Sequence, residues 1–427
     1  MDRRPYMRLW EELSRSKAMI LFSGPRQVGK TTLAKAIAAR FPASLYFNWD
    51  VRDDRVRLMK NPSFFTTIDN PGPGPALVVL DEIHKYRQWK NYLKGAYDAH
   101  AEHFHFLVLG SGRLAIYQKG GDSLAGRYFL FSLWPLTMAE MGGRQRTIAE
   151  FRADPLGKPA ARRDDNAIWT RLSHLSGFPE PYLSDSADHY RRWSSAYAHQ
   201  LVREDIRDAT EIKRLDDVEA LSLLLPSRVG SPLSIESLSR DLEVSFNTVR
   251  AWVEVFERFF LCFRLRPWTS KIQRGLTKQT KLFLMDYPQI ESSAARFENM
   301  VALELRRAVS SWNEWGWGTF DLFYVRNRDG QEVDFLITER RKPMLLVETK
   351  ESETDLAPAL ARFQDYLHVP AVQLVNRPGI SRRFRRGPLE AAVLTASQWL
   401  AGLRFRHEHD MKVFGHETVD TGTVKLL

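Results

Sequence analysis

The chain has 427 residues, which at roughly 150 residues per domain predicts two or three domains. Hydrophobic residues make up 44% of the sequence, enough for folded cores, and this excludes a largely disordered protein. The net charge of +10 suits a polyanionic partner, and the single cysteine, Cys262, excludes a disulfide framework or a zinc site built from cysteines.

At its start the chain lacks the apolar stretch and small-residue cleavage site of a signal peptide. No apolar run approaches the roughly 18 residues that are needed to cross a bilayer. We therefore expect a cytoplasmic protein without a membrane partner.

The first third of the chain alternates short β-type runs with helical stretches, which is typical of a parallel sheet covered by helices. The strands are expected at Ala18–Phe22, Ser44–Asn48, Ala76–Leu80 and His105–Leu109, and helices at Lys30–Arg40 and Trp89–His100. We expect residues 1–140 to form one α/β domain.

A complete G-x-x-x-x-G-K-[ST] motif follows the first of these strands and opens a helix, which is the context that a phosphate-binding loop requires. Its residues and the threonine after them are Gly24, Pro25, Arg26, Gln27, Val28, Gly29, Lys30, Thr31 and Thr32. Backbone N–H groups of such a loop bind phosphate oxygens, Lys30 reaches the β- and γ-phosphates, and the Thr31 hydroxyl ligates Mg²⁺. The alternative, an ordinary glycine-containing turn, does not explain the full motif.

Two acids, Asp81 and Glu82, end the apolar strand at residues 76–80. Ligands of open parallel sheets bind at this carboxyl edge. We expect Asp81 to hold Mg²⁺ and Glu82 to orient and deprotonate a water molecule, a pairing that favours a hydrolase over a simple binder.

Two further residues are candidates for contacts with the phosphates. Ser111 follows the strand at residues 105–109, and Arg127 has the charge to neutralise a transferring phosphoryl group in its own subunit or in a neighbour's. For Arg127 a surface salt bridge is an equally good interpretation.

These motifs occur in one order, with Gly112 after Ser111 and Ser123 ahead of Arg127, and together with Leu133, Pro135, Leu136 and Glu140. The set resembles prokaryotic AAA-type ATP-binding proteins that carry a C-terminal domain of unknown function, and the resemblance continues through Gly177 to Glu180 and Arg203 to Ile206. The chain departs from that pattern at His84, where glutamine is usual after Asp-Glu-Ile. The resemblance implies ATP and Mg²⁺ as cofactors.

The composition shifts after residue 140, and the polar segment 141–168 is expected to be a surface linker. Helical periodicity fills residues 169–280, where Leu233 to Trp252 has the pattern of a helix-turn-helix capped by Ser245, with a wing strand at Phe260–Leu265. The resemblance implies a winged helix here. Asn247, Thr248 and Arg250 are candidate DNA contacts, but such modules also serve as packing units or ATPase lids.

Residues 281–405 are rich in β-type runs, and 406–427 are expected to be a tail. Four side chains in this region have nuclease-like spacing: Glu298 on a helix, Asp334 on a strand, and Glu348 with Lys350 on the next strand. Glu298, Asp334 and Glu348 are candidate ligands of Mg²⁺, and Lys350 would position or activate water.

The order of these elements resembles the restriction-endonuclease-like fold. The chain departs from the family pattern after Asp286, where a glycine is usual two residues later. A remnant of that fold without catalysis is the alternative. The arginines of Ser381–Arg386 suit either a phosphate clamp or a solvated basic loop.

The sequence thus predicts an α/β protein with an N-terminal AAA-type parallel sheet, a helical winged-helix middle and a C-terminal restriction-endonuclease-like domain. Its predicted function is Mg-ATP hydrolysis coupled to a C-terminal domain that binds nucleic acid, DNA above RNA, with nuclease activity left open. The alternative is an ATP-dependent switch or scaffold whose C-terminal half only binds a partner. If Arg127 acts in the site of a neighbouring subunit, the protein is expected to form a homo-oligomer.

Overall fold

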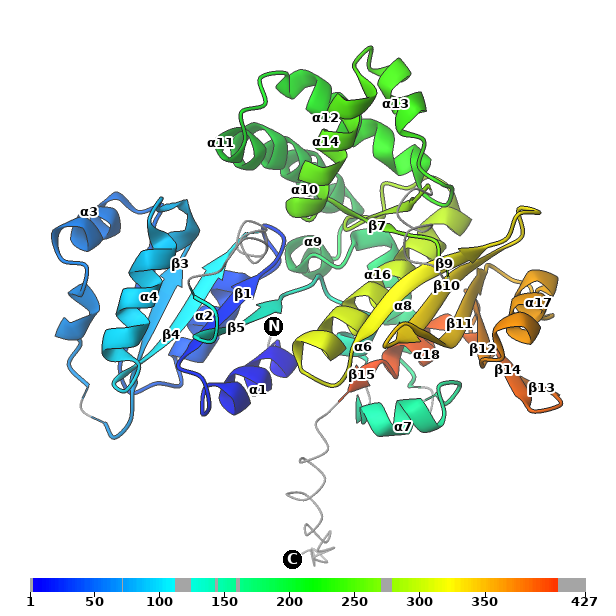
Figure 1. Ribbon diagram of the computed structural model, residues 1–427, viewed down its shortest axis with the longest axis horizontal. Coiled ribbons are helices and arrows are strands. Elements are labelled where there is room, and N and C mark those ends of the chain that lie inside the picture. The colour runs from blue at the N-terminus through cyan, green and yellow to red at the C-terminus, as the bar shows by residue number, and fades with distance from the viewer. Residues whose placement is uncertain are drawn as a thin grey trace, which may run out of the picture.

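A computed structural model describes residues 3–70, 72–111, 124–142, 145–158, 162–269 and 279–405. Three regions follow one another: an N-terminal α/β region (blue and cyan in Figure 1), a helical middle (green) and a C-terminal α/β region (yellow to red). Across these ranges, no helix has both the length and the apolar character that crossing a membrane demands.

The N-terminal region is built on a five-stranded parallel sheet with the strand order β2-β3-β4-β1-β5. Its strands are β1 (Met19–Ser23), β2 (Ser44–Asn48), β3 (Ala76–Asp81), β4 (Phe104–Gly110) and β5 (Tyr128–Ser132), and its helices are α1 (Arg4–Leu13), α2 (Lys30–Ala38), α3 (Arg52–Lys60) and α4 (Trp89–His100), with short 3₁₀ turns η1 (Phe64–Thr67) and η2 (Ile83–Lys85). The four expected strands and two expected helices are confirmed to within two residues; α1, α3 and β5 were not predicted.

The two faces of this sheet bury different side chains because residues alternate along a strand. On β1, Met19 and Leu21 pack with α3 and α4, whereas Ile20 and Phe22 pack with α1 and α2. The sheet is therefore covered on both faces, which leaves its carboxyl edge for the loops that follow β1 and β3.

Part of the segment predicted as a surface linker is folded and packs on the C-terminal region. After α6 (Met138–Met141), which ends where that segment begins, it contains β6 (Gln145–Arg146) and α7 (Ile148–Ala153), and β6 pairs with β15 (Arg404–Phe405). Thr147 and Glu150 form a capping box, and the buried Phe151 ring contacts Trp312. The polar composition hid a short helix that has a few large apolar residues.

The helical middle leads into an antiparallel pair of strands. Its elements are α8 (Asp165–Leu175), α9 (Pro179–Ser184), α10 (Ala187–Gln200), the π-helix η4 (Leu201–Ile206), α11 (Arg207–Ala209), α12 (Leu215–Leu224), η5 (Leu225–Arg228), α13 (Ile235–Asp241), α14 (Phe246–Arg258), β7 (Cys262–Leu265) and β8 (Lys281–Leu284). Ser245 accepts a hydrogen bond from the backbone N–H of Thr248 (3.1 Å) and caps α14, as expected.

The C-terminal region is a six-stranded mixed sheet with the order β13-β14-β12-β11-β10-β9. Its elements are α16 (Ser293–Glu314), β9 (Phe320–Arg326), β10 (Glu332–Glu339), β11 (Lys342–Lys350), α17 (Pro358–Leu367), β12 (Ala371–Val375), β13 (Ser381–Arg386), β14 (Leu389–Thr395), α18 (Ala396–Ala401) and β15. Helices α16 and α17 cover opposite faces. The register of β10 shifts between Val333 and Leu336, an irregularity that includes Asp334.

The basic stretch at Ser381–Arg386 is not a loop but the edge strand β13, and its predicted use as a phosphate clamp stays a prediction. Three of its arginines contact acids: Arg383 pairs with Asp154 (3.0 Å), Arg382 lies 3.6 Å from Asp355, and Arg385 lies 4.0 Å from Glu390. Its charge is thus partly balanced within the chain.

Candidate functional site

The loop between β1 and α2 has the backbone of a phosphate-binding loop. A side chain at Gly24 would place its Cβ 2.3 Å from the carbonyl oxygen of Leu133, so this position admits only glycine. Gly29 has a φ of 96°, in the left-handed region, and immediately precedes the first residue of α2, Lys30. Both glycines thus serve the close turn that brings N–H groups to one centre.

Lys30 lies across this loop and is buried. Its Nζ donates to the carbonyl oxygens of Gly24 (3.0 Å) and Pro25 (2.7 Å). Burial lowers the pKa of the ammonium, while the charges of Glu82 and Asp81 oppose that change. The lysine is thus held by weak neutral acceptors, which an anionic phosphate would replace.

Thr31 and Asp81 meet where α2 begins and β3 ends. The Thr31 hydroxyl donates to Asp81 Oδ2 (2.9 Å), and the Tyr46 hydroxyl donates to the same oxygen. A hydroxyl and a carboxylate beside a phosphate site fit Mg²⁺, which is usually bound by one or two protein oxygens together with phosphate and water. The residues predicted to hold Mg²⁺ at this loop are therefore brought together.

Glu82 follows in a left-handed backbone conformation, with a φ of 55°. Its carboxylate lies 3.3 Å from Lys85 Nζ and 3.7 Å from His84 Nε2, and the His84 ring is 3.4 Å from the Ser111 hydroxyl. Burial raises the pKa of Glu82, although Lys85 and Lys30 oppose it. A carboxylate with a raised pKa is better suited to accept a proton near neutral pH.

One cleft of about 650 Å³ lies between the N-terminal region and the helical middle, and its lining includes Lys30, Thr31, Asp81, Glu82 and Ser111. Its far wall was not predicted from the sequence, and it consists of Pro179, Glu180, Leu183, Glu204, Asp205 and Asp208. The signal was present in part, because Gly177 to Glu180 and Arg203 to Ile206 belong to the motifs that carried the family resemblance. No chemistry had been assigned to them.

Arg26 and Gln27 connect the loop to that wall. Arg26 Nη1 lies 3.0 Å from Asp205 Oδ1 and 3.1 Å from Glu204 Oε2. Gln27 Oε1 accepts a hydrogen bond from the Trp193 indole (2.5 Å). The helical middle therefore contacts two consecutive residues of the phosphate loop.

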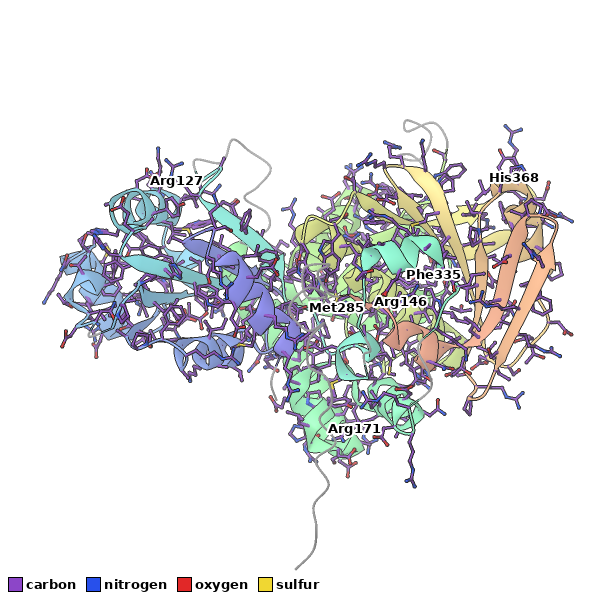
Figure 2. The ribbon with its side chains drawn as sticks, turned by 90° about the horizontal axis from the view of Figure 1, so that it is seen from below. Arg127, Arg146, Arg171, Met285, Phe335 and His368 are labelled. Carbon is purple, nitrogen blue, oxygen red and sulfur yellow. The ribbon has the colours of Figure 1, made fainter. Side chains whose placement is uncertain are left out.

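Arg127 is not brought to this cleft. It precedes β5, whose first residue Tyr128 pairs with Met19 at the start of β1, whereas the phosphate loop follows the end of β1 at Ser23. The strand places roughly 13 Å between these two edges. Arg127 instead pairs with Asp98 of α4 (2.6 Å), at the outer part of the N-terminal region (Figure 2). Gly112 and Ser123, also in the expected motifs, lie outside the described residues.

In the C-terminal region the predicted residues Asp334, Glu348 and Lys350 do come together. Lys350 Nζ lies 2.7 Å from Glu348 Oε1, and Glu348 Oε2 accepts a hydrogen bond from the backbone N–H of Asp334 (3.3 Å). Asp334 Oδ2 accepts hydrogen bonds from the backbone N–H (2.9 Å) and the hydroxyl (2.6 Å) of Thr349. The strand pairing β10–β11 places them on adjacent strands.

A lysine that the sequence analysis did not single out occupies the centre of this cluster. Lys281 of β8 is 1% exposed, and its Nζ lies 2.9 Å from Glu298, 2.5 Å from Glu332 and 3.7 Å from Asp334. We call these residues, with Glu348 and Lys350, the C-terminal acid cluster. Burial acts to lower the pKa of Lys281, but the surrounding carboxylates raise the pKa by more than burial lowers it. The net pKa is therefore above its usual value, and the ammonium stays charged.

The C-terminal acid cluster does not fit the metal site that we expected. Within the ranges that the structure covers, no group of three or more His, Cys, Asp or Glu side chains is arranged to hold a metal ion. The oxygens of Glu298 and Asp334 face the Lys281 ammonium, and Glu348 pairs with Lys350.

Three family models match consecutive parts of the chain. Residues 16–142 match an AAA domain, residues 168–287 match a domain of unknown function (DUF8612), and residues 294–386 match another domain of unknown function (DUF4143).

Two curated relatives are uncharacterized proteins. One from Mycobacterium tuberculosis is 23% identical over 268 residues, which is 63% of this chain and 54% of the relative. One from Methanocaldococcus jannaschii is 25% identical over 299 residues, 64% of this chain and 61% of the relative. The chain thus spans little more than half the length of the curated relatives it matches.

Among solved structures, a Walker-type ATPase of Pyrococcus abyssi has a TM-score of 0.40 at 16% identity, over 68% of this chain and 94% of that chain. The structure of Drosophila ORC bound to AT-rich DNA and Cdc6 has a TM-score of 0.24 at 11% identity, over 68% of this chain and 89% of that chain. Similarities at this level do not bear on function. The AAA match and the complete phosphate-loop motif instead support ATP binding by an AAA domain at residues 16–142, and the match at residues 294–386 is to a domain of unknown function.

Proposed function

We propose that this protein binds Mg-ATP in the cleft between its N-terminal region and its helical middle, hydrolyses it, and uses the nucleotide state to control a binding surface in the rest of the chain. The observation that carries the proposal is that Lys30, the Thr31–Asp81 pair and Glu82 all line one cleft. A phosphate-binding loop alone would account for binding, and Glu82 adds a base for hydrolysis.

Each residue has a separate task in this reaction. The N–H groups of the loop and the Lys30 ammonium bind the β- and γ-phosphates, and Lys30 exchanges its carbonyl acceptors for phosphate oxygens. Thr31 and Asp81 hold Mg²⁺, which supplies charge neutralisation to the phosphates. Glu82 orients the attacking water and accepts its proton, and Lys85, 3.3 Å away, keeps the carboxylate in place.

The direct test is ATP binding and turnover by Lys30→Ala. We expect this variant to lose tight Mg-ATP binding, because the lysine neutralises phosphate charge in the bound state. Lys35→Ala, an exposed lysine on the same helix, is the matched control and should bind and turn over ATP as the wild type does. Normal ATP binding by Lys30→Ala would overturn the proposed site.

For the rest of the chain we propose a winged helix that binds nucleic acid through the start of α14. The order α12, α13, α14, β7 and β8 supports this assignment, and Asn247 and Arg250 are exposed there. Arg250→Ala should weaken binding to short duplex DNA at low salt, and wild-type ATPase activity should rise when that DNA is added. If neither changes, the partner is of another class and the scaffold alternative holds.

A nuclease is the second candidate, favoured by the gathering of Asp334, Glu348 and Lys350 in an α/β region of restriction-endonuclease-like element order. Lys281 argues against it, because a protein ammonium already balances the acids to which a metal ion would bind. We therefore propose a C-terminal region that binds without cutting. If the wild type nicks plasmid DNA in the presence of Mg²⁺ or Mn²⁺, and Asp334→Ala and Lys350→Ala each abolish the nicking, the C-terminal region is a nuclease.

A further inference from the structure

Arg26 occupies an unusual position for a residue of a phosphate loop, because its charge is directed to another region of the chain. Its guanidinium pairs with Glu204 and Asp205, at 3.1 and 3.0 Å, and is about one third exposed. Burial acts to lower the pKa of Arg26, but the Asp205 and Glu204 carboxylates together raise the pKa by more than burial lowers it. The loop and the π-helix η4 therefore share one ion-pair cluster.

The next link runs from η4 to α12. Arg203, beside Glu204 in the sequence, reaches the opposite way: its Nη2 lies 2.7 Å from Glu219 Oε2, and it also pairs with Asp216. Three consecutive residues, Arg203 to Asp205, thus connect the phosphate loop to the first helix of the proposed winged helix. The π-helical turn directs Arg203 and the two acids to different neighbours.

The charge of the cleft sets two demands on Arg26. The wall from the helical middle carries the four carboxylates of Glu180, Glu204, Asp205 and Asp208, and Arg26 is the arginine in the cleft lining that the structure describes. The phosphates of ATP bring several negative charges to the same space. Carboxylates and phosphates repel each other, so the two kinds of group compete for the single positive charge of Arg26.

We propose that Arg26 exchanges partners when ATP binds: it leaves Glu204 and Asp205 for the phosphates, and η4 moves away from the loop and carries α12 with it through Arg203. This proposal rests on the proposed function and adds how the site communicates. The nucleotide-free protein is then the closed state, in which the acids of η4 compete with ATP for one guanidinium. The bound ATP stabilises the open state only because it contacts Arg26 in that state alone.

The first test is nucleotide affinity, measured by titration with a fluorescent ATP analogue. The double variant Glu204→Gln/Asp205→Asn removes the competing acids, and we expect it to bind ATP about fivefold more tightly than the wild type, the size of effect that one partly exposed ion pair supplies. The control Asp188→Asn/Glu211→Gln removes two exposed carboxylates elsewhere in the helical middle and should leave the affinity unchanged. Unchanged or weaker binding by the first variant would overturn the exchange.

The second test measures the movement itself. Met59 on α3 and Leu223 on α12 are 64% and 71% exposed, and the one cysteine of the sequence is buried, so Met59→Cys/Leu223→Cys accepts a pair of spin labels selectively. We expect ATP to shift the distance distribution of this labelled protein. Adding Glu204→Gln/Asp205→Asn should produce the shifted distribution without nucleotide.

The two possible failures are distinguishable. If the labelled protein binds ATP and its distance distribution stays the same, the exchange at Arg26 is wrong while the ATP site stands. If no nucleotide binds at all, the proposed function itself fails. Arg203→Ala separates the steps further, because it should keep the affinity of the wild type and lose the ATP-dependent shift.

Discussion

The cleft at the phosphate loop and the C-terminal acid cluster both bring carboxylates and lysines together, yet they balance charge in different ways. In the cleft, Lys30 donates hydrogen bonds to two neutral carbonyl oxygens, and two acids of the far wall, Glu204 and Asp205, pair with Arg26. In the C-terminal cluster, Lys281 is enclosed by three carboxylates and is almost fully buried. The first arrangement is open to an external polyanion, and the second is closed on itself.

This difference shows that the residue types of a site do not decide its chemistry. Glu298, Asp334 and Glu348 have the spacing that a metal-dependent nuclease needs, but a buried ammonium provides the positive charge. Burying such a cluster is costly unless every charge is paired, and here the pairs are within the chain. We therefore expect the cleft to respond to ligands and the C-terminal cluster to respond to mutations that unbalance it.

The largest effect is expected at Glu82, in the cleft that we expect to respond to ligands. Glu82→Gln should keep Mg-ATP binding and lower turnover by about a hundredfold or more, because the carboxylate acts on water and not on the bound phosphates. Single-turnover kinetics with the exposed variant Glu102→Gln as control measure this directly. Normal turnover by Glu82→Gln would assign the base to another residue.

A comparable effect, on stability instead of turnover, is expected in the C-terminal cluster. Lys281→Met leaves Glu298, Glu332 and Asp334 without their buried counter-ion and should lower the free energy of unfolding by about 3–5 kcal/mol. Lys350→Met removes a lysine whose side chain is about one third exposed and that pairs with one buried carboxylate, Glu348, so it should cost clearly less than Lys281→Met. Equal losses in denaturant titrations of the two variants would remove the distinction between the two lysines.

A buried carboxylate outside both sites provides a test of the same principle by pH. Burial raises the pKa of Glu304 to about 7, with Arg307 opposing, from an unfolded value of 4.5. The folded chain then holds more protons than the unfolded chain between these values, so stability falls as pH rises from 4.5 to 7. Glu304→Gln cannot lose this proton, so its free energy of unfolding should decrease by up to about 3 kcal/mol less than that of the wild type over this pH range.

The measurement for Glu304 is the thermal unfolding midpoint of wild type and Glu304→Gln between pH 4.5 and 8. We expect the unfolding midpoint of Glu304→Gln to rise relative to that of the wild type as the pH increases. Parallel curves for the two proteins would mean that Glu304 keeps an ordinary pKa in the fold.

The smallest effect is expected at Arg127, which pairs with Asp98 away from the cleft. Arg127→Ala in dilute protein should change ATP turnover less than twofold, because the pair lies at the protein surface. A tenfold loss would contradict this placement. Recovery of activity in a mixture of Arg127→Ala and Lys30→Ala proteins would assign Arg127 to a neighbour's site, as the sequence analysis left open.

The sequence predicted well what depends on residues close together in the chain. The phosphate loop, the strand that ends at Asp81 and the helix that starts at Lys30 follow from local spacing, and the structure brings Thr31, Asp81 and Glu82 to one cleft. The proximity of Glu348 and Lys350 also follows from local spacing, because residues two apart share a face of a strand.

The sequence did not predict contacts that depend on how distant segments pack. Arg127 had the spacing of a phosphate contact, but Arg26 is the arginine in the cleft, and its partners Glu204 and Asp205 lie almost 180 positions away in the chain. Lys281 stands at the start of a strand with no pattern that marks it as the centre of three carboxylates. The short helix α7 was hidden because its buried residues, Ile148 and Phe151, are few among many charged ones.

One reaction tests the central comparison most directly: purified protein incubated with Mg²⁺, ATP and supercoiled plasmid, with phosphate release and plasmid topology followed together. We predict that the wild type releases phosphate and leaves the plasmid intact, and that Lys30→Ala releases no phosphate and also leaves the plasmid intact. Plasmid nicking that is lost in Lys350→Ala while phosphate release continues would contradict the account, because it would show an active metal site where Lys281 now balances the acids.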